Sequence, residues 1–293
     1  MANLSNMPAR IEIVELQANG FTFRCRTCGM SNMGDPVILL HGFPETSHMW
    51  TKVLQSLAAQ GYRCLAPDLR GYSSGARPPE IGAYTIDKIA SDVVALADRV
   101  GFAKFHLVAH DWGAGCGWTV VQRDPARVQS WTALSIPHMA AFEHAKKTDA
   151  EQIGRSWYMG FFQLPFIPEQ MFGLITLSPS KFWKFSDPEE IADYLSVFGS
   201  YAGRNATINW YRANHELPVR YGDVDLPTLL IWGNTDIAVG RAGIAATSQY
   251  MKGEYTLVLD GRNKASISTA QWFAFVSPFE RFRHCTIEVL YKV

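Results

Sequence analysis

The sequence predicts an α/β protein whose core is a mostly parallel, doubly wound sheet flanked by helices. The first observation is a set of short, continuous apolar runs, which are typical of strands buried on both faces of a parallel sheet. These runs lie at 36–40, 105–109, 130–136 and 227–232. The second observation is that segments with apolar residues at helical spacing, such as 85–100, separate the runs. Such alternation of strand and helix predicts right-handed crossover connections.

The first half of the chain supplies these elements in order. Residues 10–26 alternate loosely between apolar and polar side chains, which indicates an edge hairpin. After it we expect, in order, a strand at 36–40, a helix at 50–59, a strand at 62–66, a helix at 85–100, a strand at 105–109, a helix ending at 123 and a strand at 130–136. His41 directly follows the strand at 36–40, and Asp111 lies two residues after the end of the strand at 105–109. Ligands of doubly wound sheets lie at the carboxyl ends of the strands, so both positions are candidates for a functional site.

Residues 138–220 have a different pattern. Aromatic residues cluster there with helix-like spacing, at Trp157-Tyr158, Phe161-Phe162, Phe182-Trp183 and Trp210-Tyr211. Because this segment contains no buried strand run, we predict a helical insertion that forms a lid over the sheet. The sheet resumes at 227–233 and 255–259, so the core is expected to comprise 1–137 and 221–293.

The composition favours a cytoplasmic enzyme or binding protein without a metal or other cofactor. The 293 residues suffice for one large domain, and the 27 basic and 27 acidic residues give no reason to expect nucleic acid or an anionic membrane as a partner. Five cysteines, including a lone C-x-x-C at Cys25 and Cys28, indicate reduced thiols rather than a zinc site. The chain shows neither a signal-peptide pattern nor an apolar run of membrane-spanning length.

Asp111 is the first candidate catalytic residue. A short apolar strand ends just before it, and glycines follow at 113, 115 and 117 before an apolar helix. This arrangement places Asp111 on a sharp strand-to-helix turn, the geometry of a nucleophile elbow with Asp in the place usually held by Ser. A carboxylate is ionised at pH 7 and can attack an sp3 carbon to form an alkyl ester. The alternative is that Asp111 only caps the following helix.

Further motifs, in matching order and spacing, resemble those of the α/β-hydrolase superfamily, and within it the epoxide hydrolases. They are His41-Gly42-Phe43-Pro44, Asp68-x-Arg70-Gly71-Tyr72, His110-Asp111-Trp112-Gly113 and Trp232-Gly233-x-x-Asp236, with Trp157-Tyr158-x-x-Phe161-Phe162-Gln163-x-Pro165 and Asn209-Trp210-Tyr211-Arg212 in the predicted lid. The resemblance covers residues 10–260. It implies an α/β-hydrolase fold and the opening of a small apolar epoxide by water to a vicinal diol.

The resemblance also assigns roles in the opening of the epoxide. It implies that Asp111 is the nucleophile and that Tyr158 and Tyr211 donate hydrogen bonds to the epoxide oxygen. A phenol suits this task because it is a donor at pH 7 and its hydroxyl can serve as a general acid. The alternative for each tyrosine is a core aromatic residue with a satisfied hydroxyl.

Hydrolysis of the ester needs other groups. The resemblance implies that the backbone N–H groups of Phe43 and Trp112 hold the oxyanion and that Asp236 orients a base histidine, although an Asp after a strand is also a common turn residue. The family carries this histidine just after the last strand, but 261–264 reads Gly-Arg-Asn-Lys here. The only histidine after Asp236 is His284, which is either recruited by an altered C-terminal fold or a surface residue of a replaced tail.

Two other histidines lie near the candidate site. His110 precedes Asp111, but its side chain should point differently from that of the nucleophile, and His41 is expected to support the oxyanion loop. We therefore predict a weak or single-turnover hydrolase that accumulates alkylated Asp111 unless His284 reaches Asp236.

Two alternatives stay open at this point, a haloalkane dehalogenase and a ligand-binding homologue. A haloalkane dehalogenase also uses an Asp nucleophile, but that family usually has Asn where Phe43 stands and lacks the tyrosine pair. A fluoroacetate dehalogenase would have Arg where Trp112 stands, and Asp111 excludes a serine esterase. The missing histidine also favours a ligand-binding homologue without full turnover. The oligomeric state and the natural substrate are not determined by the sequence.

Overall fold

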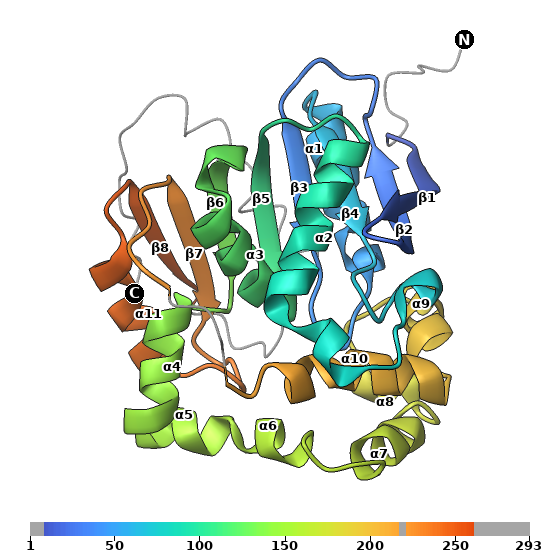
Figure 1. Cartoon of the computed structure of the whole chain (residues 1–293), viewed down its shortest axis with the longest axis vertical. Helices are drawn as coiled ribbons and strands as arrows, with labels where there is room; N and C mark the ends of the chain where they lie inside the picture. Colours follow the sequence, from blue (N-terminus) through green and yellow to red (C-terminus); the bar gives the residue numbers. More distant parts are fainter. Residues whose placement is uncertain (1–8, 217–220, 261–293) are drawn as a thin grey trace.

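The computed structural model describes residues 9–216 and 221–260, which form a sheet with helices on both faces (Figure 1). The described strands are β1 (Ile11–Ala18), β2 (Phe21–Cys28), β3 (Pro36–Leu40), β4 (Arg63–Pro67), β5 (Phe105–His110), β6 (Val128–Leu134), β7 (Thr228–Gly233) and β8 (Tyr255–Asp260). They form one sheet in the order β1-β2-β4-β3-β5-β6-β7-β8. β1 and β2 form the antiparallel hairpin, β2 also runs antiparallel to β4, and the strands from β4 to β8 pair in parallel. The predicted fold class is therefore confirmed.

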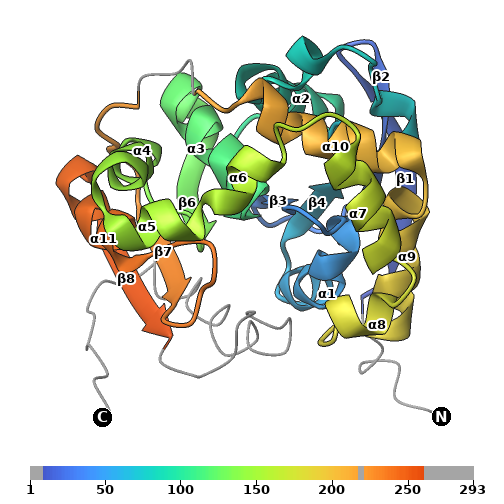
Figure 2. The same cartoon turned by 90° about the horizontal axis from the view of Figure 1, so that it is seen from below.

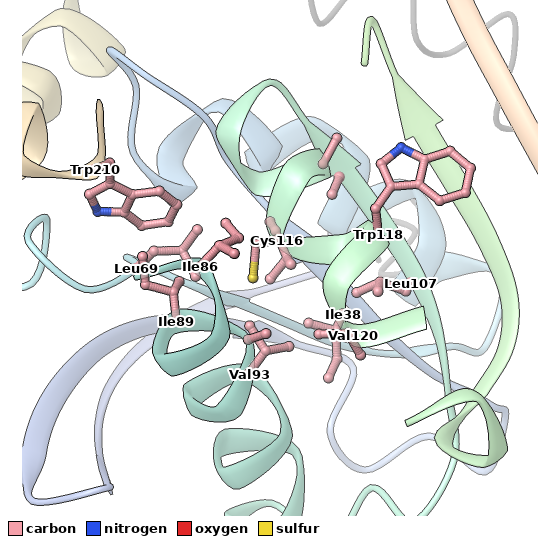
Figure 3. Packing of buried hydrophobic residues seen from close by; sticks show 14 of the residues in the cluster. Ile38, Leu69, Ile86, Ile89, Val93, Leu107, Cys116, Trp118, Val120 and Trp210 are labelled. Atoms are coloured by element: carbon pink, nitrogen blue, oxygen red, sulfur yellow. The ribbon is translucent and has the colours of Figure 1, made fainter. Parts of the chain in front are cut away.

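The apolar runs form strands because both faces of the sheet are covered. In β3, Ile38 and Leu40 belong to the larger hydrophobic cluster, whereas Val37 and Leu39 belong to a second cluster on the opposite face. The helices that pack on the core strands are α1 (Thr51–Ala59), α2 (Ile86–Arg99) and α3 (Trp112–Arg123). Leucines of α1 belong to the second cluster, and Figure 3 shows side chains of α2 and α3 packed together with Ile38 in the larger one. The alternating direction of successive side chains explains why every position of such a strand is apolar.

Between β6 and β7 the described part of the chain forms helices and no strand. They are α4 (Met139–Thr148), α5 (Ala150–Arg155), α6 (Trp157–Phe161), α7 (Ile167–Ile175), α8 (Pro179–Phe182), α9 (Pro188–Phe198) and α10 (Tyr201–Ala213). These helices lie across the carboxyl ends of the parallel strands, along the lower edge in Figure 1. The α10 helix is held to the core where the Trp210 indole donates a 2.8 Å hydrogen bond to the Arg70 carbonyl oxygen. After β7, α11 (Arg241–Ala246) leads to β8.

A buried ion pair holds the loop after β4 to helix α2. The Arg70 guanidinium donates from Nε and Nη2 to the two carboxylate oxygens of Asp92, both at 2.7 Å. Asp92 is fully buried, and a third donor, the Asn19 amide, lies 2.8 Å from it. Burial raises the pKa of the Asp92 carboxyl, and the hydrogen bonds and charge of Arg70 oppose that shift. The stability of the buried carboxylate therefore depends on its cationic partner.

We expect Arg70→Met to lower the free energy of unfolding by about 3–5 kcal/mol, because it leaves Asp92 buried without its counter-charge. The matched control is Arg123→Met. Arg123 pairs at 3.0 Å with Asp87, an exposed carboxylate on the same helix, α2, as Asp92. That exposed pair is expected to contribute less than about 1 kcal/mol. Urea unfolding of both variants measures the difference, and equal small losses would contradict the stabilising role of the Arg70 pair.

Candidate active site

Asp111 lies on a strained turn between β5 and α3. Its φ of 51° and ψ of −126° place a non-glycine residue in a sparsely populated backbone region. Two glycines make room for this turn. A Cβ on Gly42 would lie 2.3 Å from the Cβ of Asp111, and one on Gly113 would lie 2.3 Å from the His41 carbonyl oxygen. The elbow geometry predicted from the small residues around Asp111 is therefore present.

The Asp111 carboxylate faces the loop after β3 instead of capping its helix. Asp111 occupies the N-cap position of α3, but its side chain makes no capping hydrogen bond. Its Oδ1 atom accepts a 2.8 Å hydrogen bond from the backbone N–H of Phe43. Burial raises the pKa of Asp111, and the charge of His110 and the N–H groups of Phe43 and Trp112 oppose this shift. The arrangement provides a poorly hydrated carboxylate beside two backbone donors, which is what nucleophilic attack and a later oxyanion require.

Tyr158 on α6 and Tyr211 on α10 lie against each other on the side of the inserted helices. Their ring centroids are 6.0 Å apart in an edge-to-face arrangement. The ring of Tyr211 also packs edge-to-face on Phe43 at 5.4 Å and on Trp112 at 5.0 Å. Burial raises the pKa of both phenols, and the negative charge of Asp111 adds to the shift. Both hydroxyls therefore stay protonated over the physiological range and can act as donors.

One cavity of about 580 Å³ connects these groups. Among its lining residues are five of the predicted site: Phe43, Asp111, Tyr158, Tyr211 and Asp236. Its other walls are largely apolar and include the aromatic side chains of Trp157, Phe162, Phe172 and Phe182. A second, smaller cavity of about 40 Å³ also touches Asp111, Tyr158 and Tyr211. A small apolar ligand can therefore contact the carboxylate and both phenols within one site.

Asp236 follows β7 and lines the same cavity, but its carboxylate is held by its own turn. Its Oδ1 atom accepts hydrogen bonds from the backbone N–H groups of Ala238 at 2.8 Å and Val239 at 2.9 Å. None of the described histidines forms a hydrogen bond with Asp236. His284, the candidate base, lies outside the described residues. The hydrogen bonds of Asp236 thus fit the alternative that it is a turn residue. Asp236 nevertheless lines the cavity of the candidate site.

His110 and Glu45 also belong to the site, although the sequence did not reveal them as members. His110 and Asp111 line the same cavity, together with Glu45, and the expectation that the two side chains point differently stays a prediction. The Nδ1 atom of His110 lies 3.4 Å from a carboxylate oxygen of Glu45. Burial lowers the pKa of His110, but Glu45, with smaller contributions from Asp111 and Asp236, outweighs burial, so the net pKa is raised. The position of Glu45, just after the His41–Pro44 motif, is the signal that could have identified the pair.

His41 supports the loop that carries Phe43, as the sequence analysis expected. It is fully buried, and its Nε2 atom accepts a 3.0 Å hydrogen bond from the backbone N–H of Leu69. Because Nε2 is the acceptor, Nδ1 carries the proton and donates to the Gly42 carbonyl oxygen at 3.0 Å. Burial lowers the pKa of His41, which keeps the ring neutral in this role.

The described segments, 9–216 and 221–260, contain no group of three or more His, Cys, Asp or Glu side chains placed to hold a metal ion. Within the same segments, no helix combines the length and the apolar character that crossing a bilayer requires.

Comparisons with known proteins agree with this geometry. The model of the α/β-hydrolase fold family matches residues 35–263. Epoxide hydrolase 4 of Mus musculus is 29% identical over 260 residues, which cover 84% of this chain and 72% of the relative. A solved epoxide hydrolase from metagenomes of hot environments is 25% identical, with a TM-score of 0.80 over 94% of this chain and 100% of its own. Epoxide hydrolase VrEH1 from Vigna radiata, also 25% identical, has a TM-score of 0.78 over 94% of this chain and 98% of its own.

Proposed function

The chain belongs to the α/β-hydrolase fold family, and from this premise we propose that it opens epoxides to vicinal diols through an alkyl ester on Asp111. The observation that carries the proposal is one cavity whose lining includes Asp111, Tyr158 and Tyr211. An epoxide needs a nucleophile at carbon and an acid at oxygen, and this pairing supplies both. The similarity to epoxide hydrolases in sequence and fold supports the same reaction.

The first step forms the ester. A carboxylate oxygen of Asp111 attacks one epoxide carbon, and the bond between that carbon and the epoxide oxygen breaks. The oxygen leaves with its bonding electrons and takes a proton from Tyr158 or Tyr211. The hydrogen bonds of both phenols strengthen as charge develops on this oxygen, so they lower the barrier more than they stabilise the bound epoxide.

The second step hydrolyses the ester. Water attacks the Asp111 carbonyl carbon, the N–H groups of Phe43 and Trp112 stabilise the oxyanion, and the diol leaves with one oxygen from the carboxylate. A base has to take a proton from the water, and none of the described histidines pairs with Asp236 to do so. The raised pKa of His110 favours its protonated form, which helps to keep Asp111 ionised and makes His110 a poorer proton acceptor. We therefore propose that the ester forms readily and hydrolyses slowly unless His284 reaches the site.

The substrate that fits this cavity is small and largely apolar. Aromatic side chains form much of the wall, and the inserted helices α6 and α10 supply both phenols. We propose that the inserted helices, α4 to α10, act as a lid that carries the acid groups to the nucleophile.

The dehalogenase alternative fits the site less well. The position that needs a halide-binding amide holds Phe43, whose ring packs against Phe162, Phe172, Phe198 and Tyr211.

A direct test incubates the protein with styrene oxide or with 1-chlorobutane. We expect 1-phenyl-1,2-ethanediol or its protein ester from the epoxide and no chloride release. Chloride release without reaction of the epoxide would favour the dehalogenase.

The pH dependence of ester formation should report the buried state of Asp111. Only the ionised carboxylate attacks, so the rate falls as the pH decreases through its pKa, which burial raises above the ordinary value of about 3.9. His110→Gln removes a cation that lowers the pKa of Asp111, so its rate should begin to fall at a still higher pH. Rapid-quench mass spectrometry of the ester across pH 4–8 measures both profiles. His144→Gln, an exposed change on α4, is the control, and identical profiles for all three proteins would contradict the role of His110.

A further inference from the structure

The outer side of helices α6 to α8 exposes an unusual number of large apolar side chains. We name this surface the outer apolar face and define it by residues Trp157, Leu164, Phe166, Ile167, Met171, Leu174, Leu177, Phe182 and Phe185, each of them exposed. Figure 2 looks at this side of the molecule, where α6, α7 and α8 follow one another across the near surface. A large exposed apolar patch on a water-soluble domain usually marks an interaction surface.

Helix α7 shows most clearly that the described part of the chain leaves this surface uncovered. Phe172 points inward and packs on the ring of Phe43 at a centroid distance of 5.1 Å. Ile167, Met171 and Leu174 follow the spacing i, i+4, i+7 on the outward side, and half or more of each is exposed. A surface helix normally places polar residues opposite its buried stripe, so α7 has an apolar stripe that none of the described residues covers.

The charges of this segment favour an anionic partner. Between 157 and 185 the acidic residue is Glu169, which is buried and paired with Arg212 at 2.7 Å. The ionisable groups left at the surface of this segment are Lys181 and Lys184, and the Lys184 ammonium lies 4.7 Å from the ring centre of Phe185. A second copy of the same face would therefore bring lysines against lysines. Apolar and aromatic side chains bordered by lysines are typical of surfaces that lie in the headgroup region of a membrane.

The outer apolar face is continuous with the cavity. Trp157 and Phe182 are 70% and 43% exposed, and both also line the cavity that holds Asp111. We propose that the outer apolar face docks on a lipid surface that contains anionic headgroups, with the cavity opening toward it. Apolar ligands dissolved in the lipid could then enter the cavity along aromatic side chains. The docking goes beyond the proposed reaction and does not depend on it.

Cosedimentation of the full chain with vesicles tests the docking. We use phosphatidylcholine vesicles with and without about one third phosphatidylserine, at low and high salt. The wild-type protein should sediment with the anionic vesicles, and Ile167→Gln/Met171→Gln/Leu174→Gln should lower the partition coefficient by about tenfold or more. Ile13→Gln/Met33→Gln, a change of exposed residues away from this face, is the control and should bind like the wild type.

A second variant separates the charge from the apolar contact. Lys181→Gln/Lys184→Gln should lower binding to the anionic vesicles several-fold and leave binding to phosphatidylcholine unchanged. Two results would overturn the proposal. One is a wild-type protein that stays in the supernatant with both vesicles. The other is a wild-type dimer in sedimentation velocity that the triple variant dissociates, because a second copy would then cover the face. Neither readout uses an epoxide, so failure of the docking is distinct from failure of the proposed reaction.

Discussion

Asp111→Ala is expected to abolish ester formation and diol production. The residue supplies the attacking oxygen, and removing a covalent nucleophile costs about four to six powers of ten in rate. Asp111→Asn tests the same oxygen with a smaller change, because the amide keeps the shape and can still accept the Phe43 N–H hydrogen bond. It should leave the fold intact and remove most of the activity.

The control for Asp111 is Asp236→Asn. We place Asp236 in the second step, so this variant should still form the ester at a rate close to that of the wild type. Rapid-quench measurement of the protein adduct compares the variants, and circular dichroism checks that each is folded. Undiminished diol production by Asp111→Ala would reject the assignment of the nucleophile.

Loss of the tyrosine pair is the second large effect we expect. Tyr158→Phe and Tyr211→Phe should each slow ester formation by about 5- to 150-fold, which corresponds to about 1–3 kcal/mol for one lost transition-state hydrogen bond. The remaining phenol still donates in each single variant. The double variant has no acid for the leaving oxygen, so its loss should exceed the product of the two single losses.

Tyr72→Phe is the matched control for the pair. Tyr72 is also buried near Asp111, but its ring packs on His41 at 4.4 Å and it does not line the cavity. Its variant should form the ester at a rate near that of the wild type. A double variant of Tyr158 and Tyr211 no slower than the single ones would leave both tyrosines as packing residues.

Much of the fold was predictable because the local pattern and the global arrangement agree. Ile38 and Val37 are neighbours in β3 but enter different hydrophobic clusters on opposite faces of the sheet. Both faces need apolar residues, so the strand is apolar at consecutive positions. The alternation of such strands with helices leaves few topologies. The turn at Asp111 has a φ of 51° and a close contact at Gly42, and both features restrict the residue types that can stand around it. The elbow was therefore predictable from the residues beside Asp111.

The rest of the site depends on contacts between distant segments, which periodicity does not record. The 3.4 Å approach of His110 to Glu45 joins the last residue of β5 to the loop after β3, which only the tertiary fold brings together. The backbone hydrogen bonds of Asp236 are local by contrast, and they fit the turn residue that the sequence offered as an alternative. The aromatic clusters of 138–220 predicted a helical lid over the sheet, but their pattern did not distinguish the side chains that line the cavity from those that face outward.

Intact-mass spectrometry during incubation with styrene oxide tests the central claim most directly. We predict that the protein gains the mass of one epoxide, that peptide mapping places the adduct on Asp111, and that the adduct accumulates because its hydrolysis is slower than its formation. The contradictory result is a protein that stays unmodified at every time point while the diol exceeds the protein many times over.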